Sequence, residues 1–245
     1  MDGHTREIHL SRLPAHARTL FGLELTAEQQ RAFRIMAGEL VAWNERVNLT
    51  AITEPEAIEI RHFLDSLSVL RAVKLRPGCR VIDVGTGAGF PGLPLRIVQP
   101  QIALTLVEAT GKKIEYLQHV LERLAIRDVS LVYGRAEEIG QQPEHREQYD
   151  VALARAVARL PVLVEYLLPL LRIGGRMVAL KGESAAQEAS AAQAALRLLG
   201  GELQRLIPVE LPEVAETHYL VVIDKVAASP AKYPRRPGVP ARKPL

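Results

Sequence analysis

Four glycines that follow a short apolar segment are the clearest chemical feature of this sequence. Residues 81–84 are apolar and largely β-branched apart from Asp83, and after them come Gly85, Gly87, Gly89 and Gly92. An apolar run of this length is typical of a buried parallel strand. Glycine allows positive φ angles and lets a ligand approach where a Cβ would clash. The sequence therefore predicts a strand that leads into a ligand-binding turn and a helix whose amide groups point at the ligand.

Two kinds of ligand are compatible with this glycine pattern. Gly87, Gly89 and Gly92 satisfy G-x-G-x-x-G, with Glu108 about 20 residues downstream, as in nicotinamide and flavin sites. Alternatively, residues 83–89 read D-x-G-x-G-x-G, the first motif of Rossmann-like S-adenosyl-L-methionine-dependent methyltransferases. We favour the second because the strand ends at Val84, which makes Gly85 the first residue of the turn. A purely structural glycine turn is the third interpretation.

Acidic side chains near the ends of the next two predicted strands are further candidates for binding a nucleoside. Glu108 follows the strand 104–107, where a carboxylate could bind both ribose hydroxyls. After the strand 130–133, the amide of Ala136 and the carboxylate of Glu137 are placed to meet an adenine ring. The competing interpretations are a solvated carboxylate for Glu108 and an N-terminal helix cap for Glu137 and Glu138.

Several other polar side chains are candidates for positioning a substrate. Arg155 ends the predicted strand 149–154, where a desolvated guanidinium needs a partner. Lys181 ends the predicted strand 176–181. Asn48, His62 and Asp65 interrupt apolar helical patterns. They have either a local role, as caps or as a contact one turn apart, or a place beside the active site.

The order of elements predicts an α/β fold of the Rossmann-like class I methyltransferase type, with a mostly parallel seven-stranded sheet. Residues 5–44 form two amphipathic helices, the first closed by Gly22 and the second opened by a capping box of Thr26 and Gln29. Later helices are expected at 92–98, 112–124, 161–171 and 185–199. The strands 202–210 and 218–225 form a closing antiparallel pair. We therefore divide the chain into an N-terminal helical cap (1–75), a cofactor-binding core (76–225) and a C-terminal arm (226–245).

Composition narrows the class of protein. With 245 residues and 48% hydrophobic residues, the chain can bury a full core. The single cysteine, Cys79, excludes an internal disulfide and a multi-cysteine metal site, and we expect no metal. The N-terminus lacks a signal-peptide core, and Glu165 and two prolines interrupt the most apolar run, 160–171. We expect a cytoplasmic protein without a membrane span.

The basic character of the chain is concentrated at its C-terminus. Residues 226–245 contain five prolines and no acidic residue. The basic residues there are Lys232, Arg235, Arg236, Arg242 and Lys243. We predict an extended arm that lies on RNA phosphates, with a disordered solubilising terminus as the alternative. Aromatic residues are few, and Phe90 and Tyr233 are the first candidates for stacking on RNA bases.

Taken together, these blocks resemble the bacterial small-subunit ribosomal RNA guanine-N7 methyltransferases, the RsmG or GidB family. The resemblance extends over about residues 44–245, and its most specific pieces are residues 48–50, 62–66, 83–92, 135–137, 155–156 and 233–238. It implies an adenosylmethionine-dependent enzyme that methylates N7 of one guanine in the decoding-region loop of 16S ribosomal RNA. The family's binding positions carry over onto Gly85, Phe90, the pair Ala136 and Glu137, and Arg155. The partner would be 16S ribosomal RNA or the small subunit, and we expect a monomer.

The chemistry that this resemblance implies needs little from acid and base groups. Guanine N7 holds a free lone pair and can attack the methyl group in line without losing a proton first. The sequence agrees, because residues 155–158 read Arg-Ala-Val-Ala where exocyclic-amine methyltransferases have Asn/Asp-Pro-Pro-Tyr/Phe. Alignment of the reacting atoms alone can contribute about 7 to 11 kcal/mol. The rival interpretations are a methyltransferase acting on a protein or small molecule, and an RNA-binding assembly factor without the chemistry.

Overall fold

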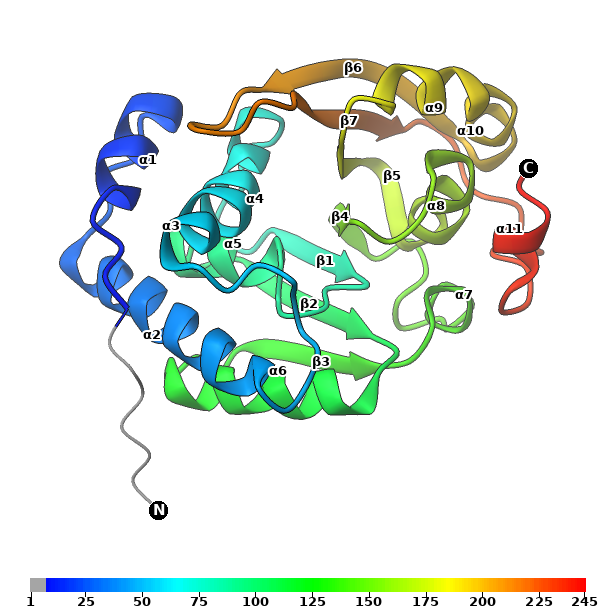
Figure 1. Cartoon of the computed structure of the whole chain (residues 1–245). Helices are drawn as coiled ribbons and strands as arrows, with labels where there is room; N and C mark the ends of the chain where they lie inside the picture. Colours follow the sequence, from blue (N-terminus) through cyan, green and yellow to red (C-terminus); the bar gives the residue numbers. More distant parts are fainter. Residues whose placement is uncertain (1–7) are drawn as a thin grey trace.

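A seven-stranded sheet with helices on both faces organises the protein (Figure 1). The structure is a computed structural model, and it describes residues 8–245. The strand order is β3-β2-β1-β4-β5-β7-β6, with β1 to β5 parallel and β7 antiparallel to both of its neighbours. The strands are β1 (Arg80–Val84), β2 (Ala103–Glu108), β3 (Val129–Tyr133), β4 (Tyr149–Arg155), β5 (Leu171–Lys181), β6 (Gly201–Val209) and β7 (His218–Lys225). The predicted fold class is confirmed.

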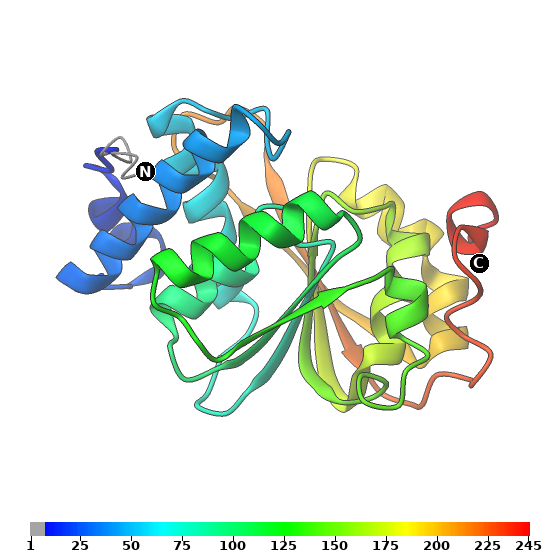
Figure 2. The ribbon, with the colours of Figure 1, turned by 90° about the horizontal axis from the view of Figure 1, so that it is seen from below.

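Helices cover the two faces of the sheet in separate groups (Figure 2). One group comprises α1 (Leu13–Phe21), α2 (Ala27–Asn44), α3 (Pro55–Ile58), α4 (Asp65–Leu67), α5 (Gly92–Val98) and α6 (Gly111–Arg123). The other comprises α7 (Ala136–Ile139), α8 (Leu160–Leu167), α9 (Ala185–Ala191), α10 (Gln193–Leu199) and α11 (Val239–Arg242). Successive β1 residues Val81 and Ile82 enter opposite hydrophobic cores, as the period of two in a strand requires. No helix within residues 8–245 is both long and apolar enough to cross a bilayer.

The N-terminal helices follow their sequence signals closely, with one difference at the start. Thr26 and Gln29 form the predicted capping box, and Gly22 closes α1 with φ of 63°. The sequence pattern predicts the first helix from residue 5, but α1 begins at Leu13, with Pro14 in its first turn. Proline suits that position because its missing N–H needs no partner there. Residues 5–7 of the predicted helix lie outside the described residues.

Two predicted helices end or break earlier than expected. The segment 161–171 is helical only to Leu167, continues as a short 3₁₀ turn at Leu168–Leu170, and then enters β5 at Leu171. Pro169 cannot donate the next helical hydrogen bond. Residues 172–175 form a bulge in β5, because Leu171 pairs with Tyr149 and Arg176 with Val151. The predicted helix 185–199 is divided at Ala192 into α9 and α10.

The predicted extended arm at the C-terminus is wrong. Residues 226–245 fold back beside α7 and α8 and end with α11 (Figure 1). Tyr233 is buried there, and Arg146 donates hydrogen bonds to the backbone carbonyls of Tyr233 and Ser229 at 2.6 and 2.9 Å. A proline-rich segment lacks a regular ladder, so side chains of the loop between α7 and β4, such as Arg146, supply its partners. The arm is therefore part of the packed domain.

Candidate functional site

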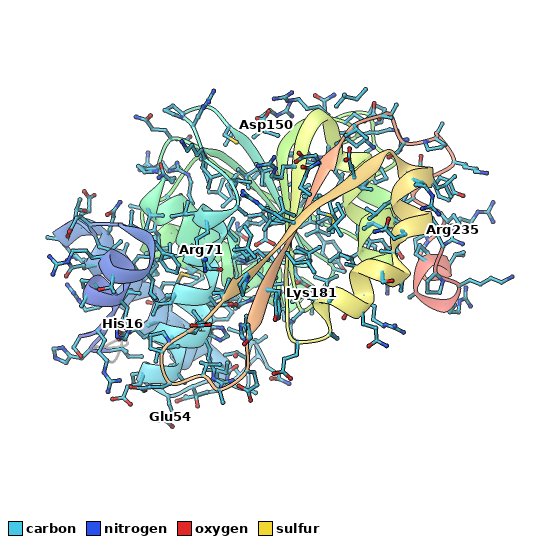
Figure 3. All side chains as sticks on the ribbon, turned by 90° about the horizontal axis from the view of Figure 1, so that it is seen from above. His16, Glu54, Arg71, Asp150, Lys181 and Arg235 are labelled. Atoms are coloured by element: carbon cyan, nitrogen blue, oxygen red, sulfur yellow. The ribbon has the colours of Figure 1, made fainter. Side chains whose placement is uncertain are left out.

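A cavity of about 530 Å³ opens at the edge of the sheet where β1, β4 and β5 end. Carboxyl ends of neighbouring strands are where open α/β sheets bind ligands. Figure 3 labels Lys181 at this end of the sheet and Asp150 at the opposite end. The walls come from the glycine turn, from segment 49–65, from the ends of β4 and β5, and from the start of β7. The polar and glycine residues among them are Thr50, Arg61, His62, Asp65, Gly85, Thr86, Gly87, Lys113, Arg155, Lys181, Gly182 and His218.

Asp83 holds the glycine turn in shape from inside β1. Its Oδ2 accepts hydrogen bonds from the Thr86 hydroxyl at 2.6 Å and from the Gly92 amide at 2.8 Å. Its Oδ1 is buried without a partner among the described residues. Complete burial raises the pKa of Asp83 to about 6, and the bonds from Thr86 and Gly92 oppose the rise. The motif aspartate is thus a structural residue that stabilises the turn, and it does not line the cavity.

The three glycines of this turn that have positive φ, Gly85, Gly87 and Gly89, serve two different purposes. A Cβ on Gly85 would lie 2.7 Å from Val157, and one on Gly89 would lie 2.5 Å from Leu93, so these positions are restricted by packing. Gly87 has φ of 61° and no atom within 4 Å of a Cβ position, and it lines the cavity. A side chain at Gly87 would project into the cavity. The turn therefore keeps a ligand-sized space open at this point.

Glu108 reaches from the end of β2 back to this turn. Its Oε2 accepts a hydrogen bond from the Gly87 amide at 3.0 Å, and its Oε1 accepts one from the Thr110 amide at 2.9 Å. The carboxylate is buried and fixed in one orientation beside the glycines. Its predicted role with ribose hydroxyls stays a prediction.

Arg155 is the centre of the polar network on the opposite wall. Its Nη1 donates to Asp65 Oδ2 at 3.0 Å and to the Arg61 carbonyl at 3.1 Å, and its Nη2 donates to His62 Nδ1 at 3.1 Å. The guanidinium also lies over the Phe90 ring, 4.9 Å from its centroid. These contacts use three of the five N–H bonds of the guanidinium. The partners that its burial required are thus Asp65, His62 and Phe90.

His62 is held as a neutral ring. Because Nδ1 accepts from Arg155, the proton is assigned to Nε2, which lies 2.9 Å from the Thr50 hydroxyl. Burial, followed by the charge of Arg155, lowers the pKa of His62 to about 3. The ring stacks on Phe90 at a centroid distance of 4.5 Å. His62 belongs to a π-helix, Glu59–Leu64, and such irregular turns are frequent at functional sites.

His218 is a cavity residue that no pattern in the sequence singles out. It begins β7, and its Nδ1 lies 3.0 Å from Asp65 Oδ1. Asp65 thus bridges Arg155 and His218 and makes no direct hydrogen bond with His62. A lone histidine 153 residues from its partner leaves no local signal, and only the antiparallel insertion of β7 beside β5 brings it here.

Of the other positioning candidates, Lys181 lines the cavity and Asn48 does not. The Lys181 ammonium donates to the Ala158 carbonyl at 2.5 Å and pairs with Glu188 at 2.8 Å. Asn48 is exposed, and its neighbour Thr50 occupies the wall in its place. The cavity residue of this segment is therefore Thr50, two residues after the predicted Asn48.

The Glu137 carboxylate, predicted to contact adenine, is engaged within the protein, and its contact with adenine stays a prediction. Glu137 is buried, and its Oε1 accepts a hydrogen bond from the Gly238 amide at 2.9 Å. It also contacts the Tyr166 hydroxyl; burial, followed by the charge of Glu137, raises the pKa of Tyr166 to about 12. The Glu138 side chain instead accepts from the Arg135 amide and caps α7. Ala136 stands at the start of α7, and its amide remains a predicted contact.

Among the predicted RNA-binding residues, Arg235 has a different role. Its guanidinium forms a two-pronged ion pair with Glu165 of α8, at 2.6 and 2.9 Å, so it is not free for RNA. Lys232, Arg236, Arg242 and Lys243 are exposed, and their RNA-binding role stays a prediction. Tyr233 is buried and presents no free face for stacking on an RNA base. Phe90 is buried too but lines the cavity, so its predicted roles stay predictions. Tyr133, at the end of β3, is 67% exposed.

No cluster of three or more potential metal-binding side chains occurs within residues 8–245. The glycine turn and the Glu108 carboxylate stand beside a cavity of a size usual for small-molecule sites.

Comparisons with known proteins agree with this geometry. The family model GidB, described as rRNA small subunit methyltransferase G, matches residues 29–214. A Ribosomal RNA small subunit methyltransferase G of Roseiflexus castenholzii (strain DSM 13941 / HLO8) is 52% identical over 227 residues, covering 93% of this chain and 96% of the relative. The protein of that name in Alkaliphilus metalliredigens (strain QYMF) is 48% identical, with coverage of 84% and 86%.

Solved structures show the same fold at low identity. A SAM dependent methyltransferase from Aquifex aeolicus superposes with a TM-score of 0.52 at 17% identity, covering 71% of this chain and 94% of that one. P. horikoshii TYW2 in complex with MeSAdo gives 0.53 at 14% identity, covering 66% and 62%. These structures show only the fold, whereas the family model and the relatives above match most of the length of the chain and show the family. The chain belongs to the rRNA small subunit methyltransferase G family, whose members are adenosylmethionine-dependent methyltransferases.

Proposed function

We propose that the protein methylates N7 of a guanine in the decoding-region loop of 16S ribosomal RNA, by direct in-line attack without a general base. The observation that supports N7 most strongly is the state of the basic groups around the cavity. Asp65 is the one carboxylate among the described lining residues, and both of its oxygens are paired with cationic or histidine side chains. His62 has both ring nitrogens engaged. The hydrogen bond to Asp65 raises the pKa of His218 and so favours its protonated ring, which cannot accept a proton.

Such a cavity suits a nucleophile that arrives with a free lone pair. An exocyclic amine or a ring N–H must lose a proton during transfer, and a positioned base would assist that step. Guanine N7 loses none, so alignment of donor and acceptor is the main requirement. The fixed Arg155, His62 and Phe90 assembly provides a rigid wall for that alignment.

Adenosylmethionine, when bound, supplies a methyl group activated by its sulfonium. The residues that fit it are the open backbone at Gly87, the carboxylate of Glu108 for the ribose hydroxyls, and the amide of Ala136 for adenine. Arg155, which lines the cavity, has two N–H bonds beyond the three already used. The exposed Arg61 and the C-terminal cations Lys232, Arg236 and Arg242 suit the phosphates of a folded RNA.

The test uses small subunits with a chemically altered target. The purified protein and labelled adenosylmethionine should modify unmethylated subunits at one guanine, and borohydride reduction followed by aniline should cleave the RNA there, as N7-methylguanine requires. Subunits reconstituted with 7-deazaguanine at that position should accept no methyl group. Methylation of the deaza subunits would overturn N7 as the acceptor, and methylation of protein or of a small molecule alone would overturn the RNA substrate.

A further inference from the structure

His218 presents a side chain to the cavity that the mechanism above does not use. One ring nitrogen, Nδ1, lies 3.0 Å from Asp65 Oδ1. The other, Nε2, has no hydrogen-bond partner among the described residues, and the residue lines the cavity together with Thr50, Asp65 and Lys181. A ring fixed through one nitrogen with the other directed at solvent or substrate is a typical recognition element.

Asp65 fixes this ring firmly. The carboxylate is buried, and its second oxygen is held by Arg155 at 3.0 Å. Because the carboxylate can only accept, His218 Nδ1 must donate to it. The imidazole can therefore neither rotate nor exchange its two nitrogens without breaking a hydrogen bond to a buried acid.

The cavity offers mainly hydrogen-bond donors to a purine. The charged side chains that line it are Arg61, Lys113, Arg155 and Lys181, and its carboxylate, Asp65, is already paired. Guanine shows two acceptors, N7 and O6, on its major-groove edge, whereas adenine shows N7 and an amino donor. When N7 must stay free to attack, O6 is the remaining atom on that edge by which a donor can distinguish guanine from adenine.

We propose that Nε2 of His218, oriented by Asp65, donates a hydrogen bond to O6 of the target guanine and so selects guanine over adenine. This inference rests on the proposed function at N7. His218 is then a specificity residue, and Asp65 is its positioning residue. A hydrogen bond to O6 exists before transfer as well as during it, so it contributes more to recognition than to acceleration of the methyl transfer.

Both ring nitrogens must carry protons for this role, and the surroundings favour that state. The hydrogen bond to Asp65 raises the pKa of His218, against burial and the nearby charges of Arg61 and Arg155. Lys181 faces the same cavity from β5, and Glu216 pairs with Arg61 at 3.8 Å near its rim. Recognition should weaken as the pH rises through the pKa of His218, because the neutral ring keeps its one proton on Nδ1.

A double-mutant cycle between enzyme and RNA tests the contact. Small subunits would carry either guanine or 2-aminopurine, which lacks O6 and retains N7, at the methylated position. For guanine subunits, His218→Ala should lower kcat/KM by about 10- to 100-fold, the loss of one charge-assisted hydrogen bond. For 2-aminopurine subunits the same substitution should have little effect on kcat/KM. The preference for guanine over 2-aminopurine should therefore be about 10- to 100-fold smaller in the variant than in wild type.

Each outcome separates this proposal from the one before it. Equal losses on both subunits would overturn the O6 contact while leaving N7 methylation in place. Coupling to inosine, which lacks the 2-amino group, in place of 2-aminopurine would show that Nε2 reads the other edge of the base and would also overturn it. His9→Ala, at an exposed histidine away from the cavity, is the matched control and should behave as wild type. Methylation of the 7-deazaguanine subunits is the separate result that removes N7 itself.

Discussion

The carboxylate of Glu165, fully buried in α8, is neutralised by the guanidinium of Arg235, seventy residues later in the chain. Glu165 Oε1 also accepts a hydrogen bond from the Arg235 amide at 2.8 Å. A buried carboxylate without its cation is strongly unfavourable. The pair therefore attaches the C-terminal segment to the core and makes that segment part of the stability of the domain.

Arg235→Ala should lower the free energy of unfolding by about 3 to 5 kcal/mol, because it leaves Glu165 buried and unpaired. Urea unfolding followed by circular dichroism measures this. The matched control is Arg236→Ala, at an exposed neighbouring arginine, which should stay within about 0.5 kcal/mol of wild type. A destabilisation no larger for Arg235 than for Arg236 would contradict a stabilising role for the pair.

Gly87→Val should abolish adenosylmethionine binding while the protein still folds. The substitution places a side chain in the cavity and adds a left-handed backbone penalty of about 1 to 2 kcal/mol. Gly78→Val is the control, since Gly78 has φ of 78°, equal space around its Cβ position and a place at the opposite edge of the sheet. Calorimetric titration should show binding to the Gly78 variant and none to the Gly87 variant, at similar unfolding free energies.

Asp83 should make the free energy of unfolding fall as the pH rises, the opposite of the usual effect of a carboxylate. Its pKa in the folded protein, about 6, lies above its usual value of 3.8, so folding favours the protonated acid. This contribution is complete below about pH 4 and is lost as the pH rises to about 6. The unfolding free energy of wild type relative to Asp83→Asn should thus fall by about 3 kcal/mol over that window. A constant difference between the two proteins would show that Asp83 is ionised throughout.

The two histidines of the cavity should titrate in opposite ways. His62 should remain neutral from pH 5 to 8 with its proton on Nε2, because its pKa is lowered to about 3. His218 should become neutral only above the usual histidine pKa, because Asp65 favours its protonated form. Nitrogen-15 NMR of the imidazoles, assigned with His62 and His218 variants, would show both, and a His62 signal that titrates near pH 6.5 would contradict the Arg155 hydrogen bond.

The exposed C-terminal cations should contribute to RNA affinity without affecting the cofactor. Replacing Lys232, Arg236 and Arg242 by alanine should lower kcat/KM for small subunits. The slope of log affinity against log salt concentration should become shallower by roughly 0.7 to 0.9 for each phosphate that these cations no longer neutralise. Adenosylmethionine affinity should not change. Point substitutions are preferable to deleting residues 226–245, because a deletion also removes Arg235 from Glu165.

A triple alanine variant at Arg18, Arg31 and Arg127, which are also exposed, controls for net charge. Its salt dependence should match that of wild type. If both triple variants lose activity and salt dependence equally, the effect comes from overall charge, and the tail has no specific role.

Local patterns in the sequence determined the strand, the glycine turn and most of the helices. The segment 81–92 predicted β1, the turn and α5, because β-branched residues, glycines and helix formers act over a few neighbouring residues. The capping box at Thr26 and the antiparallel pair β6 and β7 could be predicted for the same reason. The family also followed from the sequence, since its blocks are short and ordered along the chain.

Tertiary structure decided which polar side chains meet. His218 reaches Asp65 only because β7 inserts beside β5, and Glu137 turns to Gly238 because the C-terminal segment folds over α7. A basic, proline-rich composition predicted an arm in solvent. In the folded protein Arg235 pairs with the buried carboxylate of Glu165 on α8. Contacts between residues distant in the chain leave no periodic signal, because their energy depends on burial and geometry that exist only in the folded protein.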